Sequence, residues 1–209
     1  MMRIESVASQ PDRAGRHTVR FDNGATMRLY RQTIQDFGLY AGAELSDTEF
    51  ENLNKAAGQM SAKMRAVRIV AASSVSKSDL EKRLIHKGED PDQARQAVAW
   101  MADMDLLDDR KTARQVVQRC ISKGYGLARA KQALFEKRIP KEYWQEALED
   151  YPDQTDEIVA FLRSRLGENW EEKDLRKATD ALLRRGHSYS KIRRALQMID
   201  EGLDLTEDI

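Results

Sequence analysis

Two blocks of Lys and Arg are the residues of this 209-residue chain best suited to binding a ligand. Residues 110–141 hold ten basic residues and one acid, Glu136, and residues 176–194 hold seven basic residues and one acid, Asp180. The net charge of the whole chain is zero, so the positive charge is a local excess that favours an anionic partner. Such a partner could be the phosphate backbone of a nucleic acid or an acidic protein surface. The candidate contact residues are Arg110, Lys111, Arg114, Lys123, Tyr125, Arg129, Lys131, Arg184, Arg185, Lys191, Arg193 and Arg194.

A solvated helical face is the alternative interpretation of these blocks. It is the better one for a helix of mixed charge, but here the interspersed acids are missing and repulsion is left unrelieved. Tyr125 lies between two glycines and is a candidate for exposure and base stacking. Phe135 and Tyr143 are expected in the core.

The sequence has few candidates for catalytic or metal-binding residues. The three histidines, His17, His86 and His187, form no metal-binding spacing with Cys or Glu. Cys120 has no histidine near it in sequence and is expected to fill space in a helix. There is no glycine-rich phosphate loop. The sequence therefore predicts a protein that is not an enzyme and holds no metal or cofactor.

An acidic cluster of Asp103, Asp105, Asp108 and Asp109 could suggest a cation site. Asp108 and Asp109 follow two leucines at the expected start of a helix, where carboxylates accept hydrogen bonds from free N–H groups and favour the helix dipole. Helix capping is therefore the preferred interpretation of this cluster.

The bulk composition excludes some classes of protein. Charged residues make up 33% of the chain, and no apolar run approaches the roughly 20 residues that span a bilayer. The first residues lack the apolar stretch of a secretory signal. One cysteine, Cys120, allows no internal disulfide and fits a reducing compartment. We expect a cytoplasmic protein that does not contact membranes.

The basic blocks lie within a helical unit that is repeated along the chain. A leucine followed by polar residues, a turn and a second amphipathic segment recurs after 50 and then 48 residues, beginning at Leu84, Leu134 and Leu182. Repeats of this period are stacked supersecondary units. The first repeat is acidic, with nine acidic and five basic residues in 77–109, whereas the other two repeats are basic.

The N-terminal residues show a different pattern. Residues 16–21 and 25–30 alternate polar and apolar side chains around the turn at 22–24, which predicts a β-hairpin. Its buried face should carry Val19, Phe21, Met27 and Leu29, and residues 32–45 should form a short helix and a loop. Ser46 and Glu49 then match a capping box that opens a long helix over about 47–73.

The repeats should each contain three helices joined by short turns. Predicted boundaries are 1–66 for an N-terminal extension, 67–109, 110–153 and 154–199 for the repeats, and 200–209 for an acidic tail. Ser76 or Ser78 should cap a helix that ends at Lys87, and Pro91 suits the first turn of the next helix. A helix capped by Asp108 should end at the break over 124–126, and the remaining helices are expected at 128–138, 141–150, 155–166, 172–185 and 189–199.

Four motifs in this order resemble the RecX family of regulatory proteins. They are SKSDLEKRL at 76–84 followed by Lys87-Gly88, LLDDRKTAR at 106–114, GYG at 124–126 with AKQAL at 130–134, and LLRRGHSYSKIRRAL at 182–196. The resemblance covers about 67–199, and the N-terminal hairpin and long helix are similar to an extension of longer family members. One departure is Arg138, which stands where the other repeats have Gly88 and Gly186.

The resemblance implies a mostly α fold, with three tandem three-helix repeats in an elongated curved array after the hairpin and long helix. It implies a regulator that lies in the groove of the RecA–single-stranded DNA filament and inhibits strand exchange, ATP hydrolysis and the coprotease function. RecA, single-stranded DNA and double-stranded DNA are the implied partners, and we expect a monomer. The acidic first repeat is better suited to protein than to DNA. A stand-alone DNA-binding regulator of transcription is the alternative function.

Overall fold

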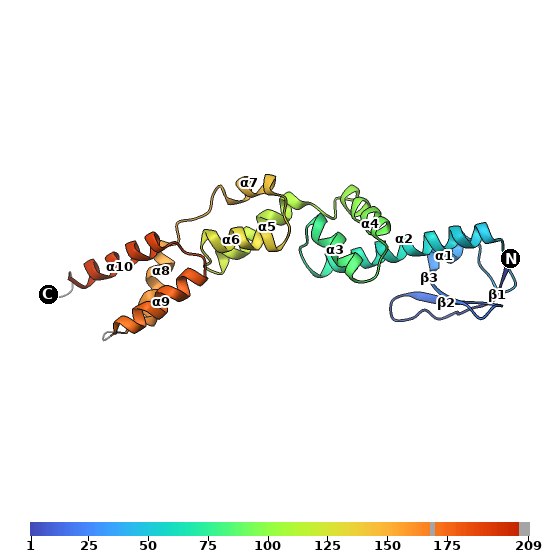
Figure 1. Ribbon diagram of the computed structural model, residues 1–209, viewed down its shortest axis with the longest axis horizontal. Helices are drawn as coiled ribbons and strands as arrows, with labels where there is room; N and C mark the ends of the chain where they lie inside the picture. Colours follow the sequence, from blue (N-terminus) through green and yellow to red (C-terminus); the bar gives the residue numbers. More distant parts are fainter. Residues whose placement is uncertain (168–169, 205–209) are drawn as a thin grey trace. The chain divides into compact units, whose positions relative to one another are not determined.

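The computed structural model describes residues 1–167 and 170–204 of a mostly helical protein, and it has two compact units. Unit 1 consists of Met1–Ser73 and Asp79–Leu107. Unit 2 consists of Ser74–Ser78 and the described residues from Asp108 onward. The predicted order of a small β segment, a long helix and then helical repeats is confirmed (Figure 1).

Unit 1 begins with a four-stranded antiparallel sheet, in the order β3-β2-β1-β4. Its strands are β1 (Met2–Val7), β2 (Arg16–Phe21), β3 (Thr26–Tyr30) and β4 (Glu44–Leu45). The predicted hairpin is β2–β3, where Val19 pairs with Met27 and Gly24 takes a φ of +80° in the turn. Strands β1 and β4 were not predicted, because β1 fully buries one residue, Ile4, and β4 has two residues.

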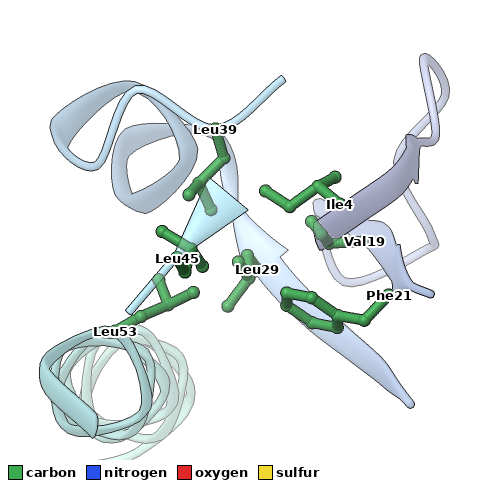
Figure 2. Packing of buried hydrophobic residues seen from close by; sticks show 7 residues of the cluster. All are labelled: Ile4, Val19, Phe21, Leu29, Leu39, Leu45 and Leu53. Atoms are coloured by element: carbon green, nitrogen blue, oxygen red, sulfur yellow. The ribbon is translucent and has the colours of Figure 1, made fainter. Parts of the chain in front are cut away.

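One face of this sheet carries the core of the N-terminal part of unit 1. Val19, Phe21 and Leu29 are buried as predicted, whereas Met27 is half-buried. Figure 2 shows Leu53, from the helix that follows the sheet, closing the same cluster. The sheet is therefore stabilised by packing against a helix, as a small sheet in water requires.

Two helices of unit 1 begin where the sequence indicated, at the Ser46 capping box and at Pro91. Helix α1 (Arg31–Asp36) is followed by α2 (Asp47–Ala72), whose capping box joins Ser46 to Glu49. Helix α3 (Lys77–His86) precedes α4 (Pro91–Asp103), where the Asp90 carboxylate accepts hydrogen bonds from two backbone N–H groups. Helices α2 and α4 pack against each other.

Unit 2 contains two three-helix groups, each with its own core cluster. The first has α5 (Asp109–Ser122), α6 (Leu127–Glu136), a 3-10 turn η1 (Lys141–Tyr143) and α7 (Trp144–Leu148). The second has α8 (Thr155–Arg165), α9 (Glu172–Arg184) and α10 (Tyr189–Asp204). Helix α10 continues past the predicted end at 199 and includes the start of the predicted tail, of which 205–209 lie outside the described residues.

The prediction of one continuous helix over 141–150 is wrong. The chain makes a 3-10 turn and then a helix of five residues. The indole N–H of Trp144 donates to the backbone carbonyl of Ile139 at 3.0 Å, and Tyr143 and Trp144 pack against the core formed by α5 and α6. These aromatic contacts hold the chain close to Pro140 in a tight turn that the amphipathic pattern did not reveal.

The turn after the second helix of each repeat has the same backbone geometry. In all three, one N–H bonds back three residues and the next N–H bonds back five residues, the pattern of a Schellman motif. The left-handed position is Gly88, Arg138 or Gly186, with φ of +90°, +55° and +88°. Arg138 therefore adopts the conformation that glycine adopts in the other two repeats.

Candidate nucleic-acid interface

All twelve predicted contact residues lie in unit 2. Arg110, Lys111 and Arg114 occupy the first turns of α5, and Lys123 is its C-cap residue. Tyr125 lies in the turn that leads to Arg129 and Lys131 on α6. Arg184 and Arg185 end α9, and Lys191, Arg193 and Arg194 lie on α10.

Two turns bring the second and third repeats together through main-chain atoms. The Gly126 N–H donates to the Arg185 carbonyl at 2.9 Å, and the Ala128 N–H donates to the Gly186 carbonyl at 3.3 Å. A Cβ atom on Gly126 would overlap the Gly186 carbonyl, and a Cβ on Gly186 would overlap the backbone of Arg129. We call this contact the glycine joint, and it places the start of α6 beside the turn between α9 and α10.

The glycine joint unites part of the predicted interface. Lys131 of α6 and Lys191 of α10 line one pocket of about 270 Å³, together with Tyr151 and His187. Tyr125 is half-buried rather than freely exposed, because its turn is held down: the Tyr151 hydroxyl donates to the Tyr125 carbonyl. Burial raises the pKa of Tyr151 to about 12, so it remains a donor.

Arg110 and Arg114 lie at the far end of α5 from the joint, and they are already paired. Both guanidinium groups donate to the carboxylate of Glu146 on α7, with Arg110 Nε at 2.7 Å from Oε2. These hydrogen bonds lower the pKa of Glu146 and raise that of Arg110. The expectation that this block lacks acidic compensation is therefore wrong here, because the acid comes from a different helix 36 residues further along the chain.

Arg129 and Lys191 are paired as well. Arg129 Nη1 lies 2.9 Å from a carboxylate oxygen of Glu136, and Lys191 Nζ lies 3.0 Å from Asp153 Oδ1. The hydrogen bond from Lys191 is the main cause of the lowered pKa of Asp153. Within the described residues, seven of the predicted cations have no ion-pair partner: Lys111, Lys123, Lys131, Arg184, Arg185, Arg193 and Arg194.

Phe135 was expected in the core, and this is wrong: its exposed fraction is 70%. The repeat register explains the exposure. Phe135 follows the buried Leu134 by one residue, which turns it about 100° around the helix, away from the core. The equivalent residues Ile85 and Leu183 are exposed by 38% and 42%. Phe135 is thus an aromatic surface residue beside the basic positions of α6, and alignment of the three repeats is the sequence signal that indicates its exposure.

The remaining polar candidates serve the fold. The Asp108 carboxylate caps α5 by accepting from the Lys111 N–H, and buried Asp109 accepts from the Lys77 N–H at 2.8 Å. Cys120 is buried, and burial raises the pKa of its thiol, which keeps it protonated. In the part of the chain that the structure describes, no three His, Cys, Asp or Glu side chains are grouped so as to hold a metal ion. None of the described helices has the length and apolarity that crossing a membrane requires.

These features define a protein of three-helix repeats with an open basic surface in its second unit. Residues 108–148 match the family model described as RecX, second three-helix domain. The regulatory protein RecX of Xanthomonas axonopodis pv. citri is 32% identical over 135 residues, which cover 63% of this chain and 83% of that protein. The chain therefore belongs to the RecX family.

Other relatives agree with this assignment. The regulatory protein RecX of Vibrio parahaemolyticus is 25% identical over 145 residues, 68% of this chain and 94% of that protein. A crystal structure of regulatory protein RecX aligns with a TM-score of 0.62 at 20% identity and covers 94% of this chain and all of that one. RecX from Lactobacillus salivarius aligns over 69% of this chain and 98% of its own, with a TM-score of 0.59 at 22% identity. These two structures support the fold alone.

Proposed function

We propose that this protein is a non-enzymatic regulator that binds the RecA–single-stranded DNA filament in the cytoplasm and inhibits its recombinase, ATPase and coprotease activities. Membership of a family of regulatory proteins is the starting point. The structural observation that carries the proposal is that seven of the predicted contact cations have no ion-pair partner within the described residues. Their charge is available to phosphate groups or to acidic side chains of a filament.

The arrangement of these cations suits a long, repetitive partner. Lys123 and Lys131 flank the turn between α5 and α6, whereas Arg184 and Arg185 lie at the turn after α9. The glycine joint connects these two turns through main-chain hydrogen bonds. A ligand that follows both turns would meet cations from two repeats without any rearrangement of the chain between them. Inhibition would then result if the bound protein favours one conformation of the filament over another.

The test is RecA-dependent ATP hydrolysis on single-stranded DNA, with this protein well below the RecA concentration. We expect inhibition by the natural sequence and a marked loss of inhibition for the double variant Lys123→Glu and Lys131→Glu. Both side chains are exposed, so the variant should fold, and circular dichroism would check this. Arg163→Glu, a charge reversal of an exposed residue on α8 outside the proposed surface, is the matched control.

The outcomes separate this function from the alternative. Unchanged inhibition by the folded double variant would show that the filament does not contact this surface. No inhibition by the natural sequence, together with binding to a preferred duplex sequence, would instead favour a stand-alone DNA-binding regulator. If the protein bound the filament without changing ATP hydrolysis, the filament would remain its partner, but inhibition of the ATPase would be excluded.

A further inference from the structure

Unit 1 contains a strongly basic cavity, although the first repeat is acidic by residue count. The cavity has a volume of about 430 Å³ and lies among the β2–β3 end of the sheet, α2 and α3. Five cations line it, Arg16, Arg65, Arg68, Arg83 and Lys87, and no carboxylate is among its lining residues. None of the twelve predicted contact residues contributes to it.

Three of the five cations are held in place by ion pairs with carboxylates that are not part of the cavity lining. Arg65 Nε donates to Glu89 at 2.6 Å, and the buried Glu89 carboxylate also accepts from the Ser61 hydroxyl at 3.0 Å. Arg83 Nη2 lies 3.0 Å from Asp79, one helical turn earlier on α3. These pairs fix two guanidinium groups at the wall of the cavity.

The third pair, Arg16 with Asp12, fixes the loop that connects β1 to β2. Arg16 donates through Nε at 3.0 Å and through Nη2 at 2.8 Å to Asp12, which also accepts from the backbone N–H groups of Arg16 and Ala14. These hydrogen bonds, with the Arg16 backbone N–H as the largest cause, lower the pKa of Asp12 to about 2. The carboxylate is therefore ionised near neutral pH and neutralises Arg16.

Arg68 and Lys87 are different, because neither forms an ion pair within the described residues. Arg68 Nη2 donates to the Ala14 carbonyl and to the Tyr30 hydroxyl, both at 2.9 Å. These neutral acceptors orient the guanidinium group without cancelling its charge. The Tyr30 hydroxyl accepts from Arg68, so its own proton is free to donate to a ligand. The cavity thus has two uncompensated positive charges.

We propose that this cavity binds a phosphate monoester, as carried by a nucleotide. Two uncompensated cations match the charge of about −1.5 to −2 on a phosphate monoester near neutral pH. Arg68 Nη2 is occupied by its two acceptors, so the Nε and Nη1 donors of Arg68 and the ammonium group of Lys87 are the groups available to phosphate oxygens. Ile69 and Ala72 provide an apolar wall, and the volume lies in the range of about 300 to 1,000 Å³ that small-molecule sites occupy.

The phosphate monoester has two sources, a free nucleotide or the 5′-phosphate at an end of single-stranded DNA. The experiment measures binding of the full chain to thymidine 5′-monophosphate, thymidine and inorganic phosphate by calorimetry. It also compares thymidine oligonucleotides with a 5′-phosphate and with a 5′-hydroxyl. We expect the monophosphate to bind and thymidine not to bind. Preference for the 5′-phosphorylated oligonucleotide over the free nucleotide would identify a DNA end, and the reverse preference a free nucleotide.

The double variant Arg68→Gln and Lys87→Gln should weaken binding of the monophosphate at least about tenfold, because it removes both uncompensated charges. The matched control is Arg31→Gln with Lys82→Gln, which removes an arginine and a lysine from exposed positions of unit 1 outside the cavity lining. Circular dichroism would verify folding, which exposed Arg68 and Lys87 should not disturb.

Three results would overturn the inference. They are no binding of any phosphate monoester, equal binding by the folded double variant, and preference for a glutamate-rich peptide over the monophosphate. No RecA is present in this experiment, and the variants leave unit 2 unchanged. Failure here is therefore distinguishable from failure of the proposed filament function.

Discussion

Arg138 adopts a backbone conformation that L-residues with a Cβ atom find unfavourable. Its φ of +55° is imposed by the Schellman hydrogen bonds from the Arg138 N–H to Phe135 and from the Ile139 N–H to Leu134. Buried Leu134 and Ile139 hold the two ends of the turn, so the chain between them must turn left-handed. The local strain is tolerated because the packing on both sides determines the turn.

Replacing Arg138 by glycine should therefore stabilise the protein. The left-handed conformation costs about 1 to 2 kcal/mol for a residue with a Cβ atom, and the entropy of glycine in the unfolded chain offsets about 0.5 to 1 kcal/mol of the gain. Arg138→Ala is the control, since it removes the same charge and long side chain but retains the Cβ atom. Chemical denaturation should give Arg138→Gly a higher free energy of unfolding than Arg138→Ala. The opposite order would mean that the turn is not strained.

His187 is a second residue whose environment has a measurable consequence. It is buried, and its Nε2 lies 3.0 Å from the Gly124 carbonyl, which can only accept, so Nε2 carries the proton. Burial is the main cause of the lowered pKa of His187, and the charges of Arg185 and Lys191 lower it further. The folded protein therefore binds this proton less readily than the unfolded chain does.

Unit 2 should lose stability as the pH falls below about 6.5, the ordinary pKa of histidine. Below that value the unfolded chain takes up a proton at His187 that the folded chain excludes, so the free energy of unfolding decreases until the folded pKa is reached. His187→Gln retains a donor and should reduce this decrease. Denaturant unfolding at about pH 7 and about pH 5.5 would measure it. An equal decrease in the variant would assign the effect to other groups.

Helices α5 and α7 are joined by an ion-pair bridge that competes with anionic ligands. Glu146 on α7 occupies the donors of both Arg110 and Arg114 on α5. A phosphate that binds either arginine must displace this carboxylate. In the unbound protein, the surface of α5 therefore carries less positive charge than its sequence suggests.

Glu146→Gln should increase affinity for single-stranded DNA, because it frees two cations on α5. If one of them then contacts a phosphate, the slope of log affinity against log salt should steepen by about 0.7. Fluorescence anisotropy with a labelled oligonucleotide over a range of salt concentrations measures both quantities. Glu149→Gln removes the charge of an exposed neighbour that takes no part in the bridge and serves as the control. A variant with unchanged affinity and slope would place α5 outside the DNA contact.

The elements also show which parts of the fold the sequence could predict. The capping box at Ser46, the Pro91 helix start and the Asp108 cap depend on neighbouring residues, and all were predicted. Strand β4 and helix α7 are too short to show a period, and contacts distant in sequence decide their form. The same limit applies to the candidate site. Pairing of Arg110 with Glu146 joins two helices, so counting charges along the chain could not reveal it.

The two units of the protein have separate hydrophobic cores. Leu53 is fully buried in the cluster beneath the sheet of unit 1. Leu162 is fully buried among α8, α9 and α10 of unit 2. A defect in one core should therefore be felt first within its own unit.

Leu53→Ala and Leu162→Ala should each cost about 2 to 5 kcal/mol, in different parts of the chain. Hydrogen exchange followed by mass spectrometry should show faster exchange in unit 1 for the first variant and in unit 2 for the second. Leu183→Ala, at a residue with 42% exposure, is the control and should change exchange little. If either core variant accelerated exchange equally throughout the described residues, the units would unfold as one.

The glycine joint also has an evolutionary consequence. Its two partners, Gly126 and Gly186, meet through backbone atoms, so no side chain at either position can become smaller to compensate for a larger residue at the other. Each glycine is therefore required independently, Gly126 by the Gly186 carbonyl and Gly186 by the backbone of Arg129. In descendants of this protein, we expect the two positions to persist together, and loss of either to accompany a rebuilt connection between the second and third repeats.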